Sequence, residues 1–408
     1  MDPVLNPFAP GAGSRPPELA GRDPIVESAT TALKRVRIGN HAKGKFLLGL
    51  RGVGKTVLLR RLQEIAEGET YLTAFIEASE GRRLSDLLIP ELRTTLYRLS
   101  TVEKARAVVN RAMGALRSFA SMFKVAYADV EFGVDPAPGD AAIGDLQADL
   151  PNLMLLVGQA AGAAERPVAI FIDEVQYLQR DELSALIGAL HRVAQKNLPL
   201  IVLGAGLPQL AGLAGEAKSY AERLFDFPNM GPLGAEESKR AVREPILHAG
   251  KEITDSALEA IVRRTGGYPY FLQEWGYHSW DVAERSPIDE RDVERATARA
   301  AANLDTSFFR VRFDRLTPRE QDYLRAMAEL GPGPHRSGEI AAKLSMEVTD
   351  AGSLRTGLIR KGMIYAPAHG ETAFTVPMFD DYMRRVMPGW EPTTQTRKKR
   401  RKNADEPG

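Results

Sequence analysis

The chain has no cysteine among its 408 residues, which excludes disulfides, thiolate zinc sites and cysteine catalysis. It also lacks an excess of either charge, because 54 Lys and Arg stand against 53 Asp and Glu. Any contact with nucleic acid must therefore come from a local patch. No apolar run approaches the roughly eighteen residues that span a bilayer, and the opening Met-Asp-Pro-Val lacks the basic and apolar regions of a secretion signal. We expect a cytoplasmic protein without membrane contact.

A glycine-rich loop is the most specific feature that the sequence does contain. The run from Gly49 to Thr56 reads G-x-x-x-x-G-K-T, between an apolar run that ends at Leu48 and an apolar-periodic stretch that begins at Val57. A strand, a glycine loop and a helix N-terminus in this order direct backbone N–H groups and the helix dipole at one phosphate. The pattern predicts binding of a nucleoside triphosphate. A glycine turn that merely precedes a lysine would lack this context.

Each position of the loop has an expected role. Gly52 and Gly54 carry no Cβ, so the backbone can wrap inward around the phosphates. Lys55 would bridge the β- and γ-phosphates, and the hydroxyl of Thr56 would bind Mg²⁺. The expected nucleotide-binding set also includes the other loop positions and the residue after them, namely Gly49, Arg51, Val53 and Val57.

Two carboxylates close a second apolar strand. Residues Val168 to Ile172 form the kind of run that is buried on both faces of a parallel sheet, and Asp173 and Glu174 follow it directly. Because ligands bind at the carboxyl ends of such strands, Asp173 would hold the Mg²⁺ shell and Glu174 would orient and polarise the attacking water. The alternative is an acidic pair that caps the following helix. With the glycine loop upstream, the sequence predicts hydrolysis of ATP.

The order of elements predicts an α/β protein with three folded parts. Strands and helices alternate over residues 19–233, which favours a doubly wound parallel sheet, with an irregular insertion at about 120–150. Residues 234–303 are wholly helical and would form a small lid. Residues 304–390 contain three helices and a β-hairpin around His369-Gly370, which is the pattern of a winged helix.

Both ends of the chain would be disordered tails. Residues 1–18 are rich in proline and small residues, a composition that cannot bury enough surface to order itself. Residues 391–408 contain the basic run Arg397 to Lys402 and no apolar anchor. The basic run is either a contact for DNA phosphates or simply a solvated end.

The winged helix leaves a similar choice open. Its longer helix, predicted over residues 350–361, carries Arg355, Arg360 and Lys361, which could face a DNA major groove. Winged helices also dock proteins or cover a nucleotide domain, so the pattern does not decide between double-stranded DNA and a protein as the partner.

The chain resembles the AAA+ ATPase family, in the branch that includes origin-recognition and initiator-like ATPases and STAND signalling ATPases. The resemblance covers about residues 19–390 and rests on four motifs: Gly21-Arg22-Asp23, the loop from Gly49 to Thr56, Phe171-Ile172-Asp173-Glu174, and Gly266-Gly267-Tyr268-Pro269. The family fold implies a P-loop NTPase core with a parallel five-stranded sheet, a helical lid over the adenine, and hydrolysis at an interface between subunits.

The resemblance also assigns further residues. In this branch a Gly-x-Pro turn of the lid lies against the base, so Gly267 and Pro269 look like nucleotide contacts, although a glycine helix end followed by proline is common. Arg223 precedes the last core strand, where the family often presents a catalytic arginine to a neighbouring subunit. A surface arginine paired with Glu222 or Asp226 is the alternative. Many members end the fourth strand with a polar residue. Here Leu203 to Pro208 offer no hydrogen-bonding side chain, so turnover would be slow.

The leading hypothesis is an ATPase, with ATP and Mg²⁺ as cofactors, whose nucleotide state sets DNA-associated assembly, as a homo-oligomer or with a protein partner. The alternatives are a STAND-like nucleotide switch that recruits a protein, and a helper ATPase for transposition or secretion. Stimulation of hydrolysis by duplex DNA would separate the first from the second, because a switch would be indifferent to DNA.

Overall fold

The computed structural model describes residues 1–11, 19–124, 136–137 and 140–392. Two compact units make up the chain, Met1–Ala302 and Asn303–Gly408. Within the described ranges, no helix has both the length and the apolar character needed to cross a bilayer. The strand-like part of the predicted insertion and the basic run from Arg397 to Lys402 lie outside the described residues.

The first unit is built on a parallel sheet of five strands in the order β2-β3-β4-β1-β5. Strand β3 pairs with β2 on one side and β4 on the other, and β1 lies between β4 and β5. The predicted five-stranded parallel sheet is therefore confirmed. The strands are β1 (Gly44–Leu48), β2 (Leu72–Glu77), β3 (Val168–Asp173), β4 (Leu200–Gly206) and β5 (Phe225–Asp226).

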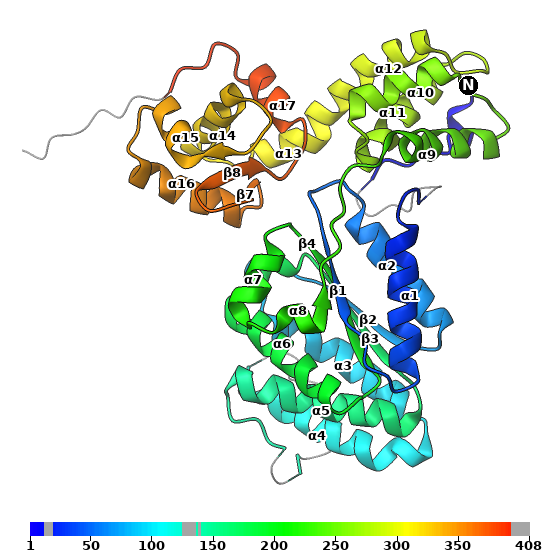
Figure 1. Ribbon diagram of the computed structural model, residues 1–408, viewed down its shortest axis with the longest axis vertical. Coiled ribbons are helices and arrows are strands. Elements are labelled where there is room, and N and C mark those ends of the chain that lie inside the picture. Colours follow the sequence, from blue (N-terminus) through cyan, green and yellow to red (C-terminus); the bar gives the residue numbers. More distant parts are fainter. Residues whose placement is uncertain (12–18, 125–135, 138–139, 393–408) are drawn as a thin grey trace, which may run out of the picture. The chain divides into compact units, whose positions relative to one another are not determined.

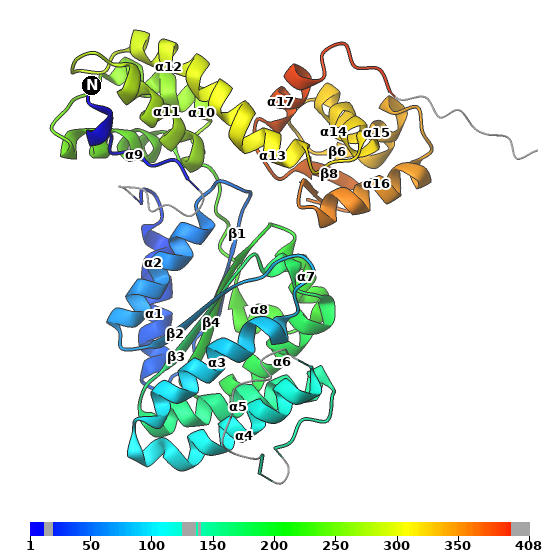
Figure 2. The ribbon, with the colours of Figure 1, turned by 180° about the vertical axis from the view of Figure 1, so that it is seen from behind.

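Helices cover both faces of this sheet (Figure 1 and Figure 2). Alternate side chains of β3 divide between two cores: Ala169 and Phe171 pack with α1 and α2, whereas Ile170 and Ile172 pack with α3 to α6. Such two-sided burial explains why the strand reads as an unbroken apolar run. The helices are α1 (Asp23–Arg37), α2 (Lys55–Gly68), α3 (Leu84–Ser100), α4 (Arg106–Met122), α5 (Leu146–Ala164), α6 (Arg180–Gln195), α7 (Leu210–Ala217) and α8 (Ala221–Leu224).

Four helices follow the sheet, in the region where the sequence predicts a lid. The Thr254 side chain caps α10 by accepting a hydrogen bond from the Ala257 N–H at 3.3 Å, and Gly266 ends that helix in the left-handed conformation. Pro269 opens α11 at a first-turn position that needs no intrahelical N–H bond. The helices are α9 (Ala235–His248), α10 (Asp255–Thr265), α11 (Pro269–Val282) and α12 (Glu290–Asn303).

The prediction of a disordered tail over residues 1–18 is wrong for residues 1–11, which pack on α11. Phe8 is only 3% exposed, and its ring fills the space that a side chain at Gly276 would need. The indole N–H of Trp280 donates to a backbone carbonyl of the same segment at 2.8 Å. Composition misjudges this segment because the apolar surface that orders it belongs to a helix far along the chain.

The second unit combines helices with a three-stranded antiparallel sheet in the order β6-β8-β7, which is consistent with a winged helix. The predicted hairpin is β7 and β8, and β6 adds a third strand that the sequence pattern does not predict. The elements are a π-helical turn (Leu304–Phe309), α13 (Arg310–Phe313), α14 (Pro318–Leu330), β6 (His335–Arg336), α15 (Ser337–Lys343), α16 (Val348–Arg360), β7 (Ile364–Tyr365), β8 (Glu371–Phe374) and α17 (Phe379–Val386).

Candidate functional site

The glycine loop and the acidic pair meet at the carboxyl edge of the parallel sheet. The loop joins β1 to α2, which begins at Lys55, and Asp173 is the last residue of β3. The hydroxyl of Thr56 donates a hydrogen bond to Asp173 Oδ2 at 2.6 Å, across a sequence separation of 117 residues. Two motifs that are distant in the sequence therefore form one site, as expected where parallel strands end side by side.

Backbone conformation explains the glycines of the loop. Gly52 and Gly54 have φ angles of 84° and 89°, in the left-handed region that side chains with a Cβ rarely adopt. Gly49 is required for a different reason, since a Cβ there would lie 2.4 Å from the Met230 carbonyl oxygen and 2.8 Å from a methyl group of Val53. The loop thus has the backbone freedom that an anion cradle needs.

Lys55 lies inside the loop rather than in solvent. Its ammonium group donates to the Leu50 carbonyl at 3.0 Å, and the residue is only 6% exposed. Burial lowers the pKa of the ammonium, while the nearby Glu174 and Asp173 carboxylates raise it. An anionic ligand in the loop would add the charge that best compensates this desolvation.

Asp173 is buried and accepts two hydrogen bonds, one from Thr56 and one from the backbone N–H of Glu174 at 2.8 Å. Burial raises the pKa of its carboxyl group, and the hydrogen bond from Thr56 opposes that change. A hydroxyl and a carboxylate are the hard oxygen donors that suit Mg²⁺. The described residues hold no cluster of three or more His, Asp or Glu that could hold a metal ion.

Glu174 follows in a left-handed conformation, with φ 53°, and opens the 3₁₀ turn Val175–Tyr177. Its carboxylate accepts a hydrogen bond from the side-chain amide of Gln176. The other end of that amide, Oε1, accepts from the backbone N–H of Leu207 at 3.0 Å. Sequence reasoning missed Gln176, and its only signal is a hydrogen-bonding side chain two positions after Glu174.

Arg51, Val53 and Val57 complete the predicted nucleotide-binding set, and they have different surroundings. Arg51 donates to the Tyr177 hydroxyl at 2.9 Å, and its buried Nε has no hydrogen-bond partner among the described residues. Val53 is buried in the core shared with α1 and α2, and Val57 is half-buried on α2. Any contact of Val53 with a nucleotide would therefore come from its backbone.

The predicted lid contacts, Gly267 and Pro269, lie next to the glycine loop. Pro269 is the first residue of α11, and the N–H of the following Tyr270 donates to the Gly52 carbonyl at 3.1 Å. Gly267 has φ 75°, and a Cβ on it would lie 2.4 Å from the Leu233 carbonyl oxygen. The turn can approach the chain this closely only because residue 267 is glycine.

The motif Gly21-Arg22-Asp23 also reaches this region. The Arg22 guanidinium is largely buried and donates to the carbonyls of Val53 at 3.3 Å and Gly231 at 2.7 Å. All four short motifs of the sequence therefore converge on the carboxyl edge of the sheet and the turn of the helical region beside it.

Arg223 lies apart from these groups within its own chain. Its side chain is 83% exposed on the short helix α8, and the nearest recorded carboxylate, that of Glu222, is 3.9 Å away. An exposed ion pair at this distance contributes little to stability. The structure thus does not bring Arg223 to the glycine loop of the same chain.

The predicted groove-facing residues of α16 are mostly engaged within the second unit. Arg355 donates to the Thr372 hydroxyl and to the Glu371 carbonyl, both at 2.9 Å, and Lys361 donates to Glu320 at 2.7 Å. Partners on β8 and α14 therefore satisfy both cations inside the unit, so a DNA groove would have to compete with these contacts. Arg360 is exposed, as is Asp350 at the start of the helix.

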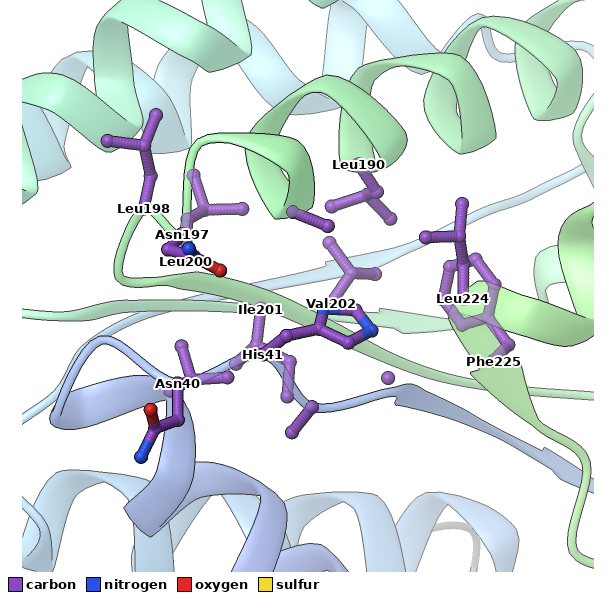
Figure 3. Close-up of a pocket in the computed structure, with 14 residues that line it drawn as sticks. Asn40, His41, Leu190, Asn197, Leu198, Leu200, Ile201, Val202, Leu224 and Phe225 are labelled. Atoms are coloured by element: carbon purple, nitrogen blue, oxygen red, sulfur yellow. The ribbon is translucent and has the colours of Figure 1, made fainter.

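A small hollow lies near the opposite end of the sheet, where β1 and β4 begin (Figure 3). Its wall is mainly apolar, with Leu190, Ile201 and Phe225, and Asn40 and His41 stand at its exposed side. Among the described residues that line it there is no carboxylate, lysine or arginine. The hollow therefore offers no group that resembles the site at the carboxyl edge.

Two family models and several solved structures are similar to this chain. Residues 18–203 match the family model of an AAA ATPase domain, and residues 306–383 match a model described only as a domain of unknown function. A Walker-type ATPase of Pyrococcus abyssi has a similar solved structure, with a TM-score of 0.55, 18% identity, and coverage of 93% of this chain and 99% of that chain. Cdc6p from Pyrobaculum aerophilum gives a TM-score of 0.47 at 14% identity, with 95% and 98% coverage.

A curated relative is an uncharacterized HTH-type transcriptional regulator of Methanocaldococcus jannaschii. It is 25% identical over 213 residues, which are 50% of this chain and 51% of the relative. The chain thus spans about half the length of that relative. Residues 18–203 thus match the model of an AAA ATPase domain, and together with the strand order and the glycine loop this match shows the P-loop AAA+ fold.

Proposed function

We propose that the chain binds ATP with Mg²⁺ at the carboxyl edge of the sheet and hydrolyses it to ADP and phosphate. The observation that carries the proposal is the hydrogen bond between Thr56 and Asp173, beside the buried Lys55. A hydroxyl and an ammonium group of the glycine loop thus lie near a carboxylate at the end of β3. These are the groups that phosphoryl transfer requires for metal and phosphate binding.

In the proposed reaction the chain supplies binding, orientation and proton transfer. Backbone N–H groups of the loop, from Gly52 to Thr56, bind the phosphates, and Lys55 exchanges its hydrogen bond to Leu50 for phosphate oxygens. Thr56 and Asp173 would hold Mg²⁺, which when bound neutralises charge on the phosphates. Glu174 orients the water that attacks the γ-phosphorus and accepts its proton as the bond to the β-phosphate oxygen breaks.

The base and a second subunit are part of the same proposal. Gly267 and Pro269 would line the adenine side of the site, because the turn that contains them is bonded to the glycine loop through Tyr270. Arg223 would reach the γ-phosphate of a neighbouring copy in a homo-oligomer, where its charge would stabilise the transition state. Its exposure supports a contact outside its own chain.

We further propose that duplex DNA is the partner, bound chiefly through phosphates. The name of the relative from Methanocaldococcus jannaschii supports this choice, as does the run of six consecutive basic residues from Arg397 to Lys402. Base readout by α16 is not part of the proposal, because Arg355 and Lys361 have partners inside the unit.

A protein-recruiting nucleotide switch is the second candidate, and one observation favours it. The first residues of α16 include the exposed Asp350, and exposed Glu347 precedes the helix. These carboxylates would repel DNA phosphates but could pair with a basic protein surface. A helper ATPase for transposition or secretion would also use a protein partner, and no described contact favours it separately.

The test measures ATP turnover by the purified full chain, with and without duplex DNA, together with DNA affinity over a range of salt concentrations. Hydrolysis with no DNA effect would favour the switch. Stimulation by DNA, with affinity that falls as salt rises, supports the leading proposal. A chain truncated after Thr396 should then lose salt dependence, by a slope of about 0.9 for each phosphate contact removed. Absence of both ATP binding and turnover would overturn the ATPase proposal itself.

A further inference from the structure

The end of strand β4 lacks a hydrogen-bonding side chain, yet the position is not empty. A Cβ on Gly206 would lie 2.8 Å from the side-chain oxygen of Gln176 and 2.8 Å from a methyl group of Leu210. The amide of Gln176 therefore fills part of the space that a side chain at residue 206 would use. The small residue on β4 and the polar residue after β3 fit one another.

We propose that Gln176 is a positioning residue for hydrolysis, which holds the Glu174 carboxylate from the end of β4. This inference rests on the proposed ATPase function. Gln176 takes the place of the polar side chain that Gly206 does not supply, and it acts on the attacking water only through Glu174.

The chemistry of the two contacts specifies a carboxamide. The Leu207 N–H requires an acceptor, and Gln176 provides Oε1 at 3.0 Å. The Glu174 carboxylate requires a donor, and Gln176 provides its NH₂ group. A glutamate at 176 would present two acceptors, and an aliphatic residue would present neither group. The orientation of the amide is thus fixed by its partners at both ends.

The contacts also connect Glu174 to the phosphate loop. Gly206 accepts a hydrogen bond from the Gly49 N–H at 3.1 Å, at the beginning of that loop. Gln176 bonds to the very next backbone unit, Leu207, which is 1% exposed. The path from Glu174 to Gly49 therefore runs through the Gln176 side chain, the peptide bond between Gly206 and Leu207, and the hydrogen bonds that join them. The glutamate side chain is long and flexible, so ordering it costs conformational entropy. Because Gln176 already holds the Glu174 carboxylate, less entropy is lost when that carboxylate aligns the attacking water.

The first test compares Gln176→Ala and Gln176→Glu with the wild-type chain and with Gln195→Ala, a control on the exposed end of α6. We expect kcat to fall roughly 10- to 100-fold in both Gln176 variants, because misplacement of a catalytic group by about 1 Å has this effect. ATP affinity, KM and melting temperature should stay near the wild-type values. The Glu variant keeps the shape and the acceptor for Leu207, so it decides the result if the Ala variant fails to fold.

The second test uses Gly206→Ala, which adds only the methyl group that displaces the amide. If both changes act through the same contact, Gly206→Ala should lower kcat, and adding it to Gln176→Ala should cause little further loss. Multiplicative losses would overturn the inference, as would wild-type kcat in Gln176→Glu. These outcomes differ from failure of the proposed function, in which the wild-type chain itself would bind or hydrolyse no ATP.

Discussion

The carboxyl edge of the parallel sheet and the exposed face of α16 are two regions in which the sequence predicts functional residues, and they differ in outcome. At the sheet edge, residues from separate motifs meet, as Thr56 and Asp173 do at 2.6 Å. The cations Arg355 on α16 and Lys361 directly after it are instead bonded to neighbouring elements of the same unit. A motif that directly follows a parallel strand predicts that its side chains lie at the carboxyl edge of the sheet. A periodic helix face alone does not show which side chains are used internally.

The difference has a physical origin. In a parallel sheet all strands run in one direction, so residues that follow the strands are brought to one edge whatever their separation along the chain. A short helix in a small unit has few buried positions, and long basic side chains can reach back to satisfy carbonyls and carboxylates. Four substitutions test this contrast, and they differ in the size of the expected effect.

Lys55→Ala should have the largest effect. It removes two charge-assisted phosphate contacts of about 2 kcal/mol each, which corresponds to roughly a 10³-fold loss of ATP affinity. Calorimetric titration with ATP and Mg²⁺ measures the change. Lys196→Ala, at an exposed position after α6, serves as the control and should bind normally. Unchanged ATP affinity in Lys55→Ala would show that Lys55 does not bind phosphate at the carboxyl edge of the sheet.

Glu174→Gln should separate binding from cleavage at the same edge. The substitution keeps the size of the side chain but removes the proton acceptor, so we expect kcat to fall roughly 10²- to 10³-fold while ATP stays bound. Single-turnover measurement of ADP formation, alongside calorimetry, checks both parts. Normal cleavage by this variant would show that Glu174 does not activate the water.

Arg223→Ala tests whether hydrolysis needs an arginine from a neighbouring subunit. We expect turnover to fall about 10²-fold, since an electrostatic contact to the transition state is lost. Mixing this variant with Lys55→Ala should restore part of the activity, because the second variant can supply an arginine in trans. If Arg223→Ala alone turned over ATP at the wild-type rate, Arg223 would be only a surface residue without a role in catalysis.

Arg355→Ala should have the smallest effect and should concern stability. Loss of its bonds to Thr372 and Glu371 would weaken the local structure by about 1–2 kcal/mol. Hydrogen exchange of β8 amides should accelerate roughly 10-fold in the full chain. Arg360→Ala, on the exposed face of the same helix, should leave exchange unchanged. If Arg355→Ala weakens DNA binding without faster exchange, the internal role assigned to Arg355 is wrong.

The sequence alone determined the features that depend on residues adjacent to one another along the chain. The strand, glycine loop and helix order fixes where Lys55 and Thr56 lie, because the glycines permit φ angles that other residues resist. The unbroken apolar run before Asp173 likewise indicated a strand buried on both faces, and the structure has that strand as β3. Local rules of backbone conformation and burial are sufficient for both predictions.

Only the tertiary structure decided which distant groups satisfy one another. It placed the Gln176 amide between Glu174 and the end of β4, seated Phe8 over Gly276, and gave Arg355 its partners on β8. The physical reason is common to all three. A flexible or polar side chain can adopt several rotamers, and the one it takes depends on donors, acceptors and cavities that other segments supply after the chain has folded.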